Sequence, residues 1–376
     1  MEIPFNRPYY TGREIEYIKQ ALEQQTSGDG PYTEKATRLL REKTGCSRIL
    51  LTTSGTHALE MAALLCGLQP GDEAIVPSFT FPSTANAIIM QGATPVFADI
   101  EEETLTIDPE DVLRKLTPAV KAVFPMHYGG MACRMDALME IARTHNLMVV
   151  EDAAQAVNAT YQNECLGTIG ELGCFSFHAT KNYSSGEGGA LLVNTDKAEI
   201  WEKAVILRQK GTDRARFLLG QVDEYSWVDR GSNYTPSDIL MAMLCAQLEK
   251  ADEITALRKR IWDLYAAELS PLLKRGIKRM RLPAQGAPNY HLFYIVLPSK
   301  QERQHVQQSL KQRGVEASTH FYPLHLSAMG RTLGGRPGSL PVTERISEGL
   351  LRLPLYTSMT EEEAGYVVRC LREVLS

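Results

Sequence analysis

The chain has 376 residues, of which 44% are hydrophobic and 23% are charged, and its formal net charge is −5. This length suits two domains, or one large α/β domain with an appendage. The small negative charge excludes an overall basic field for nucleic acid or an anionic membrane, although a local basic pocket for a small phosphorylated ligand remains possible.

The N-terminal stretch and the cysteines indicate a cytoplasmic protein. Residues 1–17 carry acids and prolines where a signal peptide needs a basic start and an apolar run. No run of about 18 apolar residues occurs, so we expect no membrane-spanning segment. The seven cysteines are scattered and lack C-x-x-C spacing, which is typical of reduced, mostly buried thiols and predicts no metal site.

From about residue 48 to residue 195, short β-rich runs alternate with helical segments, which predicts a sheet built from β–α units. The predicted strands are residues 48–53, 73–78, 94–100, 120–126, 147–152, 174–178 and 189–194. Residues 55–68 and 135–146 have apolar spacing close to 3.6, which predicts covering helices. The strands are apolar without strict alternation, as in a parallel sheet covered on both faces.

The remainder of the chain predicts a second, smaller domain. Residues 236–260 have a long helical pattern that suits a connector. A strand at 289–297, a helix at 300–315, and a turn with a final helix at 352–376 follow. We therefore predict an α/β large domain with a mainly parallel sheet over residues 1–245, including an N-terminal segment, and an α+β domain over residues 246–376.

Ligands of open α/β sheets bind beyond the carboxyl ends of the strands, so the residues there matter most. The first such end is "TTSGTHALE", where Ser54, Gly55 and Thr56 lead from a strand into a helix. Free backbone N–H groups, hydroxyls and a helix dipole together suit a phosphate. An ordinary N-cap by Ser54 or Thr56 explains the same residues.

Two further strand ends carry polar or aromatic side chains. Asp152 closes the strand in "VVEDAAQA", where it can cap the next helix with Gln155 as its partner, or hold a proton on a ligand nitrogen. Phe79 and Phe81 precede Pro82 at a predicted helix start. Aromatic residues at such positions are more often core residues than stacking surfaces for a ligand.

The fourth strand end is "CFSFHATKNYSSGEGG". Strand alternation places Phe175 and Phe177 on one face and Ser176 and His178 on the other, with Lys181 just beyond. Most loop lysines are simply solvated. Here, however, a phosphate site, a carboxylate, an aromatic ring and a lysine occur at one sheet edge, which is the set that pyridoxal phosphate needs: the lysine forms the Schiff base, the acid pairs with the pyridinium nitrogen and the aromatic ring stacks.

At this point the sequence resembles the DegT/DnrJ/EryC1/StrS family of sugar-nucleotide aminotransferases, a branch of the fold-type I pyridoxal phosphate enzymes. The segments that carry the resemblance are "SGTHALEMA", "PSFTFPSTANAI", "VFPMHYGG", "VVEDAAQA", "SFHATKNYSSGEGG", "GSNYTPSD", "HFYPLH" and "LRLPLY". They occur in family order from residue 3 to the final helix. Within the family, the segments "GDGPYT", "FHATKNYSSGEGG" and "KGTDRARFLLGQVDEYSW" look most like transaminases that form dTDP-4-amino-4,6-dideoxygalactose for enterobacterial common antigen.

The resemblance implies roles for individual residues around the cofactor. Lys181 would be the Schiff-base lysine and Asp152 the partner of the pyridinium nitrogen. Gln155 would lie near the phenolic oxygen, and Phe81 would stack on the ring. The phosphate would be held by a further group of residues, namely Gly55, Thr56 and Ser176.

The resemblance also implies contacts further from the ring. Asn233 matches an asparagine that reaches the cofactor phosphate of the other subunit, which implies a homodimer with active sites at the interface. His320 and His325 match a segment near the substrate. Phe321 stands where this segment usually has tyrosine, so we expect no hydroxyl contact there, and Thr235 stands where an arginine is usual, so we assign no nucleotide contact from it.

The implied reaction transfers an amino group from L-glutamate to a nucleotide-linked keto sugar, with pyridoxal 5′-phosphate bound to Lys181 and pyridoxamine phosphate between the half-reactions. The implied acceptor is dTDP-4-keto-6-deoxy-D-glucose, aminated to the galacto product. Two alternatives remain: amination at C3 of a dTDP-3-keto-6-deoxyhexose, and a non-catalytic protein that binds the cofactor for a regulatory purpose.

A related dehydratase is disfavoured because such enzymes carry histidine in place of Lys181. The "GEGGA" stretch is not a dehydrogenase loop because it precedes a strand.

Overall fold

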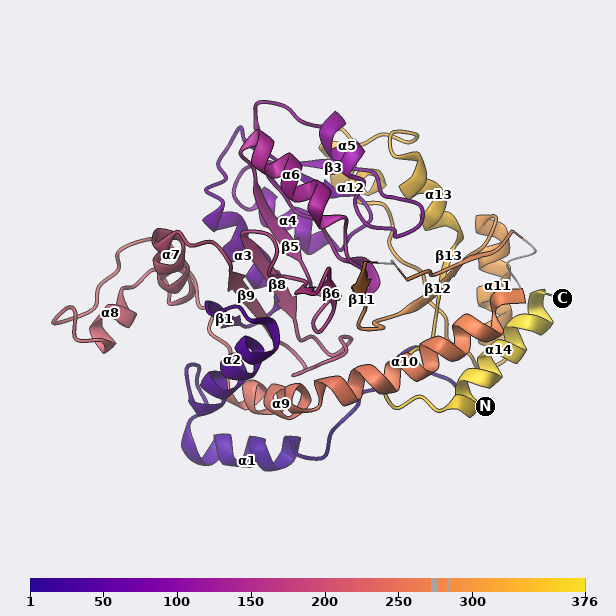
Figure 1. Ribbon diagram of the computed structural model, residues 1–376, viewed down its shortest axis with the longest axis horizontal. Coiled ribbons are helices and arrows are strands. Elements are labelled where there is room, and N and C mark those ends of the chain that lie inside the picture. The colour runs from indigo at the N-terminus through magenta and orange to yellow at the C-terminus, as the bar shows by residue number, and fades with distance from the viewer. Residues whose placement is uncertain (272–275, 283–284, 376) are drawn as a thin grey trace.

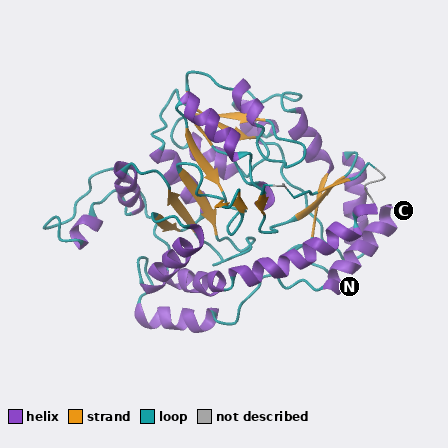
Figure 2. Ribbon diagram, in the orientation of Figure 1, coloured by secondary structure: helices purple, strands orange, loops and turns teal. Residues whose placement is uncertain are grey.

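The computed structural model describes residues 1–271, 276–282 and 285–375. Residues 272–275, 283–284 and 376 belong to the predicted C-terminal domain and lie outside the described residues. A central sheet with helices on both faces is followed along the chain by a smaller sheet with helices of its own (Figure 1, Figure 2). The predicted α/β fold class with a smaller C-terminal α+β unit is therefore confirmed.

The central sheet has seven strands within the described residues, in the order β1-β9-β8-β5-β4-β2-β3. They are β1 (Ile49–Thr52), β2 (Glu73–Pro77), β3 (Thr94–Ala98), β4 (Val120–Val123), β5 (Met148–Asp152), β8 (Leu172–Ser176) and β9 (Gly189–Val193). The pairings are parallel except where β9 pairs with β1 and β8. The predicted strands and the mainly parallel sheet are confirmed.

Both faces of this sheet are buried because successive side chains of a strand point to opposite faces. Leu51 and Val149 pack into one hydrophobic cluster, and Leu50 and Val150 pack into another on the opposite face. The first face is covered by α2 (Pro31–Thr44), α6 (Met135–His145) and α9 (Asp238–Glu249), and the second by α3 (Gly55–Leu65), α4 (Pro82–Ile89) and α7 (Ala198–Arg208). The helices predicted at 55–68 and 135–146 correspond to α3 and α6.

Three further helices and a small sheet complete this part of the chain. α1 (Glu14–Gln24) packs on α9, and α5 (Pro109–Arg114) packs on α6. β6 (Thr160–Tyr161) pairs with β7 (Glu164–Cys165) and with β11 (Gly286–Ala287). α8 (Arg214–Leu218) belongs to an arm, residues 209–233, that projects from the body at the left of Figure 1.

The C-terminal unit is an antiparallel sheet of β10 (Lys278–Arg279), β12 (Phe293–Val296) and β13 (Leu350–Leu353). Its helices are α10 (Ala251–Glu268), α11 (Lys300–Gln312), α12 (Ala328–Thr332), α13 (Pro341–Gly349) and α14 (Glu361–Leu375). The strand predicted at 289–297, the helix at 300–315 and the final helix correspond to β12, α11 and α14. β13 was not predicted, because four residues between a helix and a turn carry too little pattern.

The predicted connector over residues 236–260 is two helices, since α9 ends at Glu249 and α10 begins at Ala251. Ala251 and Ile254 pack into the core of the large sheet, whereas Ile261 and Tyr265 pack into the core of the small sheet. α10 thus begins in one core and ends in the other, as its course across the bottom of Figure 1 shows. The domain boundary between residues 245 and 246 stays a prediction.

In the described part of the chain, no helix combines the length and the apolar character that crossing a membrane requires.

Candidate active site

Lys181 lies in the loop between the antiparallel strands β8 and β9, at the carboxyl end of β8. Backbone hydrogen bonds close this loop at its base, from Phe177 N to Gly188 O at 2.8 Å and from Ser185 N to Phe177 O at 3.0 Å. A Cβ on Gly189 would come within 2.4 Å of Ser54 O, so only glycine lets β9 lie this close to the start of α3.

The Lys181 side chain lines a cavity of about 390 Å³ between the large and the small sheet units. Its amine forms no hydrogen bond or ion pair with any described residue. The pKa of Lys181 is lowered to about 8, chiefly by burial; the carboxylate of Asp152 opposes this shift, and the positive charge of Arg352 adds to it. A useful fraction of this amine is therefore unprotonated near neutral pH, as a nucleophile or general base requires.

Asp152 ends β5 and points its carboxylate into the same cavity, where it is only 3% exposed. The carboxylate accepts hydrogen bonds from the Thr84 hydroxyl at 2.7 Å and from Ala154 N–H at 3.2 Å. Sequence reasoning missed Thr84; the signal was a threonine in the first turn of a helix at the same sheet edge. The contact holds the carboxylate in one orientation.

The preceding acid, Glu151, has a different role because it points to the opposite side of the strand. Its carboxylate accepts three backbone N–H groups at 2.7 Å, those of Gly167, Ile169 and Gly170, and contacts His127 Nε2 at 2.8 Å. Glu151 and His127 are both fully buried. Of the two acids in "VVED", only Asp152 is available to a ligand.

The start of α3 forms one corner of the cavity, and the N-cap interpretation of "SGT" is confirmed there. Ser54 Oγ caps α3 by accepting from His57 N–H at 3.1 Å. Gly55, Thr56 and Ser176 line the cavity, and a Cβ on Gly55 would meet Ser176 Cβ at 2.7 Å. This corner brings hydroxyls and the positive end of a helix together without a side chain at position 55, as a bound phosphate requires.

Gln155 and Phe81 occupy the walls beside Asp152. Gln155 Oε1 accepts from Gly129 N–H at 2.7 Å, so its amide nitrogen is left without a partner among the described residues. Phe81 lines the cavity with 57% of its surface exposed, whereas Phe79 is buried in the core. An amine, a carboxylate, a phosphate corner, an amide donor and an open aromatic ring fit pyridoxal phosphate.

His320 also lines the cavity, beside Arg352 and Tyr128. Its Nε2 accepts a hydrogen bond from the Arg352 guanidinium, and its Nδ1 lies 3.4 Å from the Tyr128 hydroxyl. Burial, Arg352 and Lys181 lower the pKa of His320 to about 2, so the ring is neutral. Phe321 stacks on this ring at 4.0 Å between centroids and meets Phe79 edge-on.

Arg352, on β13, was not singled out from the sequence, although "LRLPLY" contains it. Its guanidinium lies 4.6 Å from the centre of the Phe5 ring, and its buried Nε has no hydrogen-bond partner in the described part of the chain. Burial lowers the pKa of Arg352. No carboxylate of a described residue pairs with it, so this cation can take an anionic ligand.

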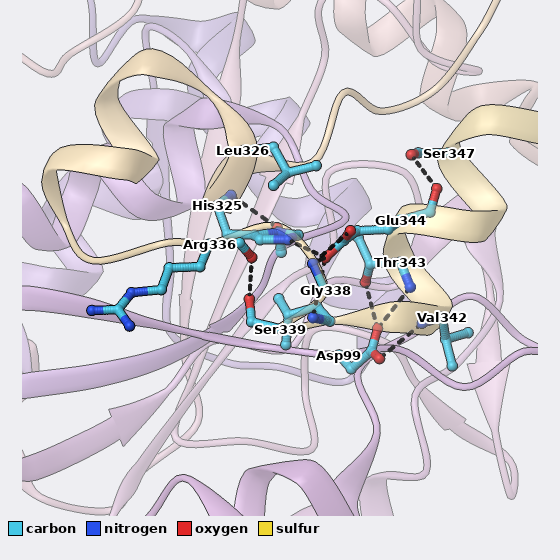
Figure 3. A network of polar contacts seen from close by, with 12 residues as sticks. Asp99, His325, Leu326, Arg336, Gly338, Ser339, Val342, Thr343, Glu344 and Ser347 are labelled. Carbon is cyan, nitrogen blue, oxygen red and sulfur yellow. Dashed lines mark hydrogen bonds and ion pairs between the residues drawn. The ribbon is translucent and has the colours of Figure 1, made fainter.

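His325, predicted near the substrate, does not reach the cavity. Its Nδ1 lies 2.7 Å from Ser78 Oγ, and its Nε2 lies 3.0 Å from Glu344 Oε1 (Figure 3). The ring is 1% exposed. The prediction of a substrate contact is corrected here, because both ring nitrogens are used by the protein itself.

Asn233 also lies apart from the cavity. It is exposed, in the arm, and its backbone pairs with Gln209. The structure therefore brings together eight of the ten predicted site residues, which are Gly55, Thr56, Phe81, Asp152, Gln155, Ser176, Lys181 and His320.

Comparison with known proteins gives consistent results. Residues 8–372 match the model of the DegT/DnrJ/EryC1/StrS aminotransferase family. The chain is 33% identical to the spore coat polysaccharide biosynthesis protein SpsC of Bacillus subtilis, over 99% of this chain and 97% of that protein. It is 32% identical to the GDP-perosamine synthase of Caulobacter vibrioides, over 98% and 97%. The PLP form of Spr1654 from Streptococcus pneumoniae superposes with a TM-score of 0.91 at 26% identity, over 100% and 99%.

Proposed function

Because the chain belongs to the DegT/DnrJ/EryC1/StrS aminotransferase family, we propose that it transfers the amino group of L-glutamate to a nucleotide-linked keto sugar. The proposed acceptor is dTDP-4-keto-6-deoxy-D-glucose, and the product is dTDP-4-amino-4,6-dideoxygalactose. The observation that carries the proposal is that the unpaired amine of Lys181 and the buried carboxylate of Asp152 line the same cavity. The names of relatives such as GDP-perosamine synthase support a sugar nucleotide as substrate.

Pyridoxal phosphate is the cofactor, and the chain has the fold-type I architecture of enzymes that use it. Lys181 would hold it covalently, and Asp152 would hold the proton on its ring nitrogen. Phe81 would stack on the ring, and Gln155 Nε2 would donate to its phenolic oxygen. The phosphate would be bound by the corner made of Gly55, Thr56 and Ser176.

When bound, the cofactor supplies an electron sink for negative charge at the reacting carbon of the substrate. The chain's own contribution is to bind, orient and move protons. The Lys181 amine takes the proton from the α-carbon of the donor, and its lowered pKa suits this task. The negative charge of Asp152 favours the protonated ring nitrogen, and Thr84 keeps that carboxylate in place.

Arg352 is the proposed partner for a carboxylate of the amino donor. Its guanidinium has no acidic partner within the described residues, and His320 and Phe5 hold it on the cavity wall. A bidentate arginine–carboxylate pair would orient the α-carbon of glutamate for proton transfer. The same guanidinium would bind the carboxylate of the product 2-oxoglutarate until the product dissociates.

We also propose that the enzyme is a homodimer in which Asn233 completes the active site of the other subunit. The arm that carries Asn233 bears exposed apolar side chains, namely Phe217, Leu218, Leu219, Tyr225, Trp227 and Val228. Such a group on a projecting arm supports burial against a second copy. A monomer in light-scattering measurements would remove Asn233 from the site.

The experiment that tests the function is incubation with L-glutamate and dTDP-4-keto-6-deoxy-D-glucose, with the product assigned by NMR. We expect loss of the long-wavelength absorption of the bound cofactor with glutamate, and a 4-amino sugar when the keto sugar follows. Product only from the dTDP-3-keto isomer, or only from a GDP-linked keto sugar, would overturn the acceptor. No loss of absorption with glutamate would indicate the non-catalytic alternative.

A further inference from the structure

The residues Asn289, Tyr290 and His291, just before β12, form a strained segment at the edge of the cavity. Tyr290 has φ +55°, a left-handed conformation that few residues other than glycine adopt. The buried guanidinium of Arg258 holds this conformation by donating to Tyr290 O at 3.0 Å and to His291 O at 2.6 Å. The fold thus fixes the position of the His291 backbone.

Asn182, the neighbour of Lys181 in the chain, fixes the orientation of the His291 ring. Its Nδ2 donates to Asn289 O at 2.8 Å, so its Oδ1 is the atom that faces His291 Nδ1 at 2.9 Å. An amide oxygen can only accept, and therefore Nδ1 carries the proton of the ring. The other nitrogen, Nε2, then presents a lone pair.

This lone pair has no partner. His291 is 7% exposed and lines the cavity, and no described residue hydrogen-bonds to its Nε2. A second proton is disfavoured, because burial together with Lys181, Arg258, Arg352 and His320 lowers the pKa of His291 well below its usual value. His291 therefore stays neutral, and its Nε2 can only accept a hydrogen bond.

The lone pair differs in character from the groups proposed above to bind the phosphate and carboxylate of the ligands. Lys181, Arg352, Gln155 Nε2 and the start of α3 offer hydrogen-bond donors or positive charge, which suit phosphate and carboxylate. A lone pair repels such anions and suits a hydroxyl hydrogen. Of the two proposed substrates, the sugar carries hydroxyl groups, whereas the only N–H donor of glutamate is the group that reacts.

We propose that His291 is a specificity-determining residue that accepts a hydrogen bond from a hydroxyl of the acceptor sugar. This inference rests on the proposed function. It means that His291 acts in the half-reaction with the sugar and not in the half-reaction with the amino donor. A structural role for His291 would affect both halves alike, because Lys181 serves both.

The test measures the two half-reactions separately by stopped-flow absorption in the wild type, His291→Leu and His291→Gln. We expect His291→Leu to slow the half-reaction with the keto sugar about 10- to 100-fold, while the half-reaction with glutamate changes less than about twofold. His291→Gln, whose amide oxygen can accept, should recover most of the loss. Binding of dTDP-D-glucose, which has no keto group to react, should weaken by a similar factor in His291→Leu.

His145→Leu, on the exposed C-terminal end of α6, is the matched control and should leave both half-reactions unchanged. Equal slowing of both halves in His291→Leu, or no slowing of either, would overturn the inference. The two proposals fail separately. If the wild type itself does not react with glutamate, the proposed function fails; if it completes both halves and His291→Leu does too, only the role of His291 fails.

Discussion

The cavity around Lys181 and the network around His325 share the segment 320–325, which contributes His320 to the cavity and His325 to the network, but they are built in opposite ways. In the network, Glu344 accepts from Gly338 N–H at 2.8 Å and contacts His325 (Figure 3). The other ring nitrogen of His325 contacts Ser78. In the cavity, the Lys181 amine and Arg352 Nε have no partner among the described residues. Buried polar groups that hydrogen-bond to each other stabilise the fold, whereas polar groups without a partner in a cavity are available to bind a ligand.

The network also links the two sheet units. Asp99, just beyond β3, accepts from Thr343 N–H and the Thr343 hydroxyl, both at 2.7 Å, and from Val342 N–H at 3.0 Å (Figure 3). Ser78 just beyond β2 and Asp99 just beyond β3 thereby hold the start of α13 and the segment that carries His320. The network sets the shape of one wall of the cavity without touching its contents.

The largest effect expected from this contrast is that of Lys181→Ala. Turnover should fall at least about 10⁴-fold, because the variant lacks both the covalent attachment and the proton-transferring amine. The fold should be unaffected, since no described residue depends on this amine, and pyridoxamine phosphate should still bind without a covalent bond. Steady-state rates and equilibrium dialysis check both points.

Lys197→Ala, an exposed lysine just before α7, is the matched control and should keep full activity. Turnover by Lys181→Ala within about tenfold of the wild type would contradict the assigned role.

The next effect is one of stability. His325→Leu should lower the free energy of unfolding by about 2–3 kcal/mol, because it leaves Ser78 and Glu344 without a buried partner. His320→Leu, five residues away, should cost less than about 1 kcal/mol but raise KM for the amino donor several-fold, because Arg352 loses the acceptor that holds it. Chemical denaturation and steady-state kinetics measure the two quantities. A larger loss of stability in His320→Leu together with a raised KM in His325→Leu would contradict the structural role of His325 and the binding role of His320.

His320 and His325 show what the sequence does not predict, namely which of two nearby histidines lines the cavity. The strand-end rule found Lys181 and Asp152 because Asp152 ends an apolar strand and Lys181 lies a few residues beyond another, so their places on the sheet edge follow from local pattern. His320 and His325 stand in one short segment and look equivalent there. They differ only through folding, since the Ser78 partner of His325 is 247 residues away in the chain.

The residues that the sequence did not reveal share one property. Thr84, Arg258, His291 and Arg352 lie inside helices or at strands whose pattern reports only burial. Their function depends on where each side chain points relative to the cavity between the large and the small sheet units. Hydrophobic periodicity carries no information about that orientation. Tyr290 is a further case, because its left-handed backbone has no sequence signature without glycine.

The smallest effect is a shift in pH dependence that reports how open the Lys181 amine is. Covalent capture of pyridoxal phosphate by the cofactor-free protein needs the unprotonated amine, so its rate should rise with pH and reach half of its maximum near pH 8. At pH 7 about one amine in ten would then be neutral, against fewer than about one in 1,000 for an ordinary lysine. Borohydride trapping followed by mass spectrometry of the Lys181 peptide gives the rate.

Two variants should move this midpoint in opposite directions. Asp152→Asn removes the charge that favours the protonated amine, so the midpoint should fall; Arg352→Met removes the repelling cation, so it should rise. A midpoint above about pH 9.5 in the wild type would mean that Lys181 is solvated like a surface lysine. The contrast between an unpaired amine in the cavity and the fully paired His325 network would then fail, and the physical basis for choosing Lys181 would be lost.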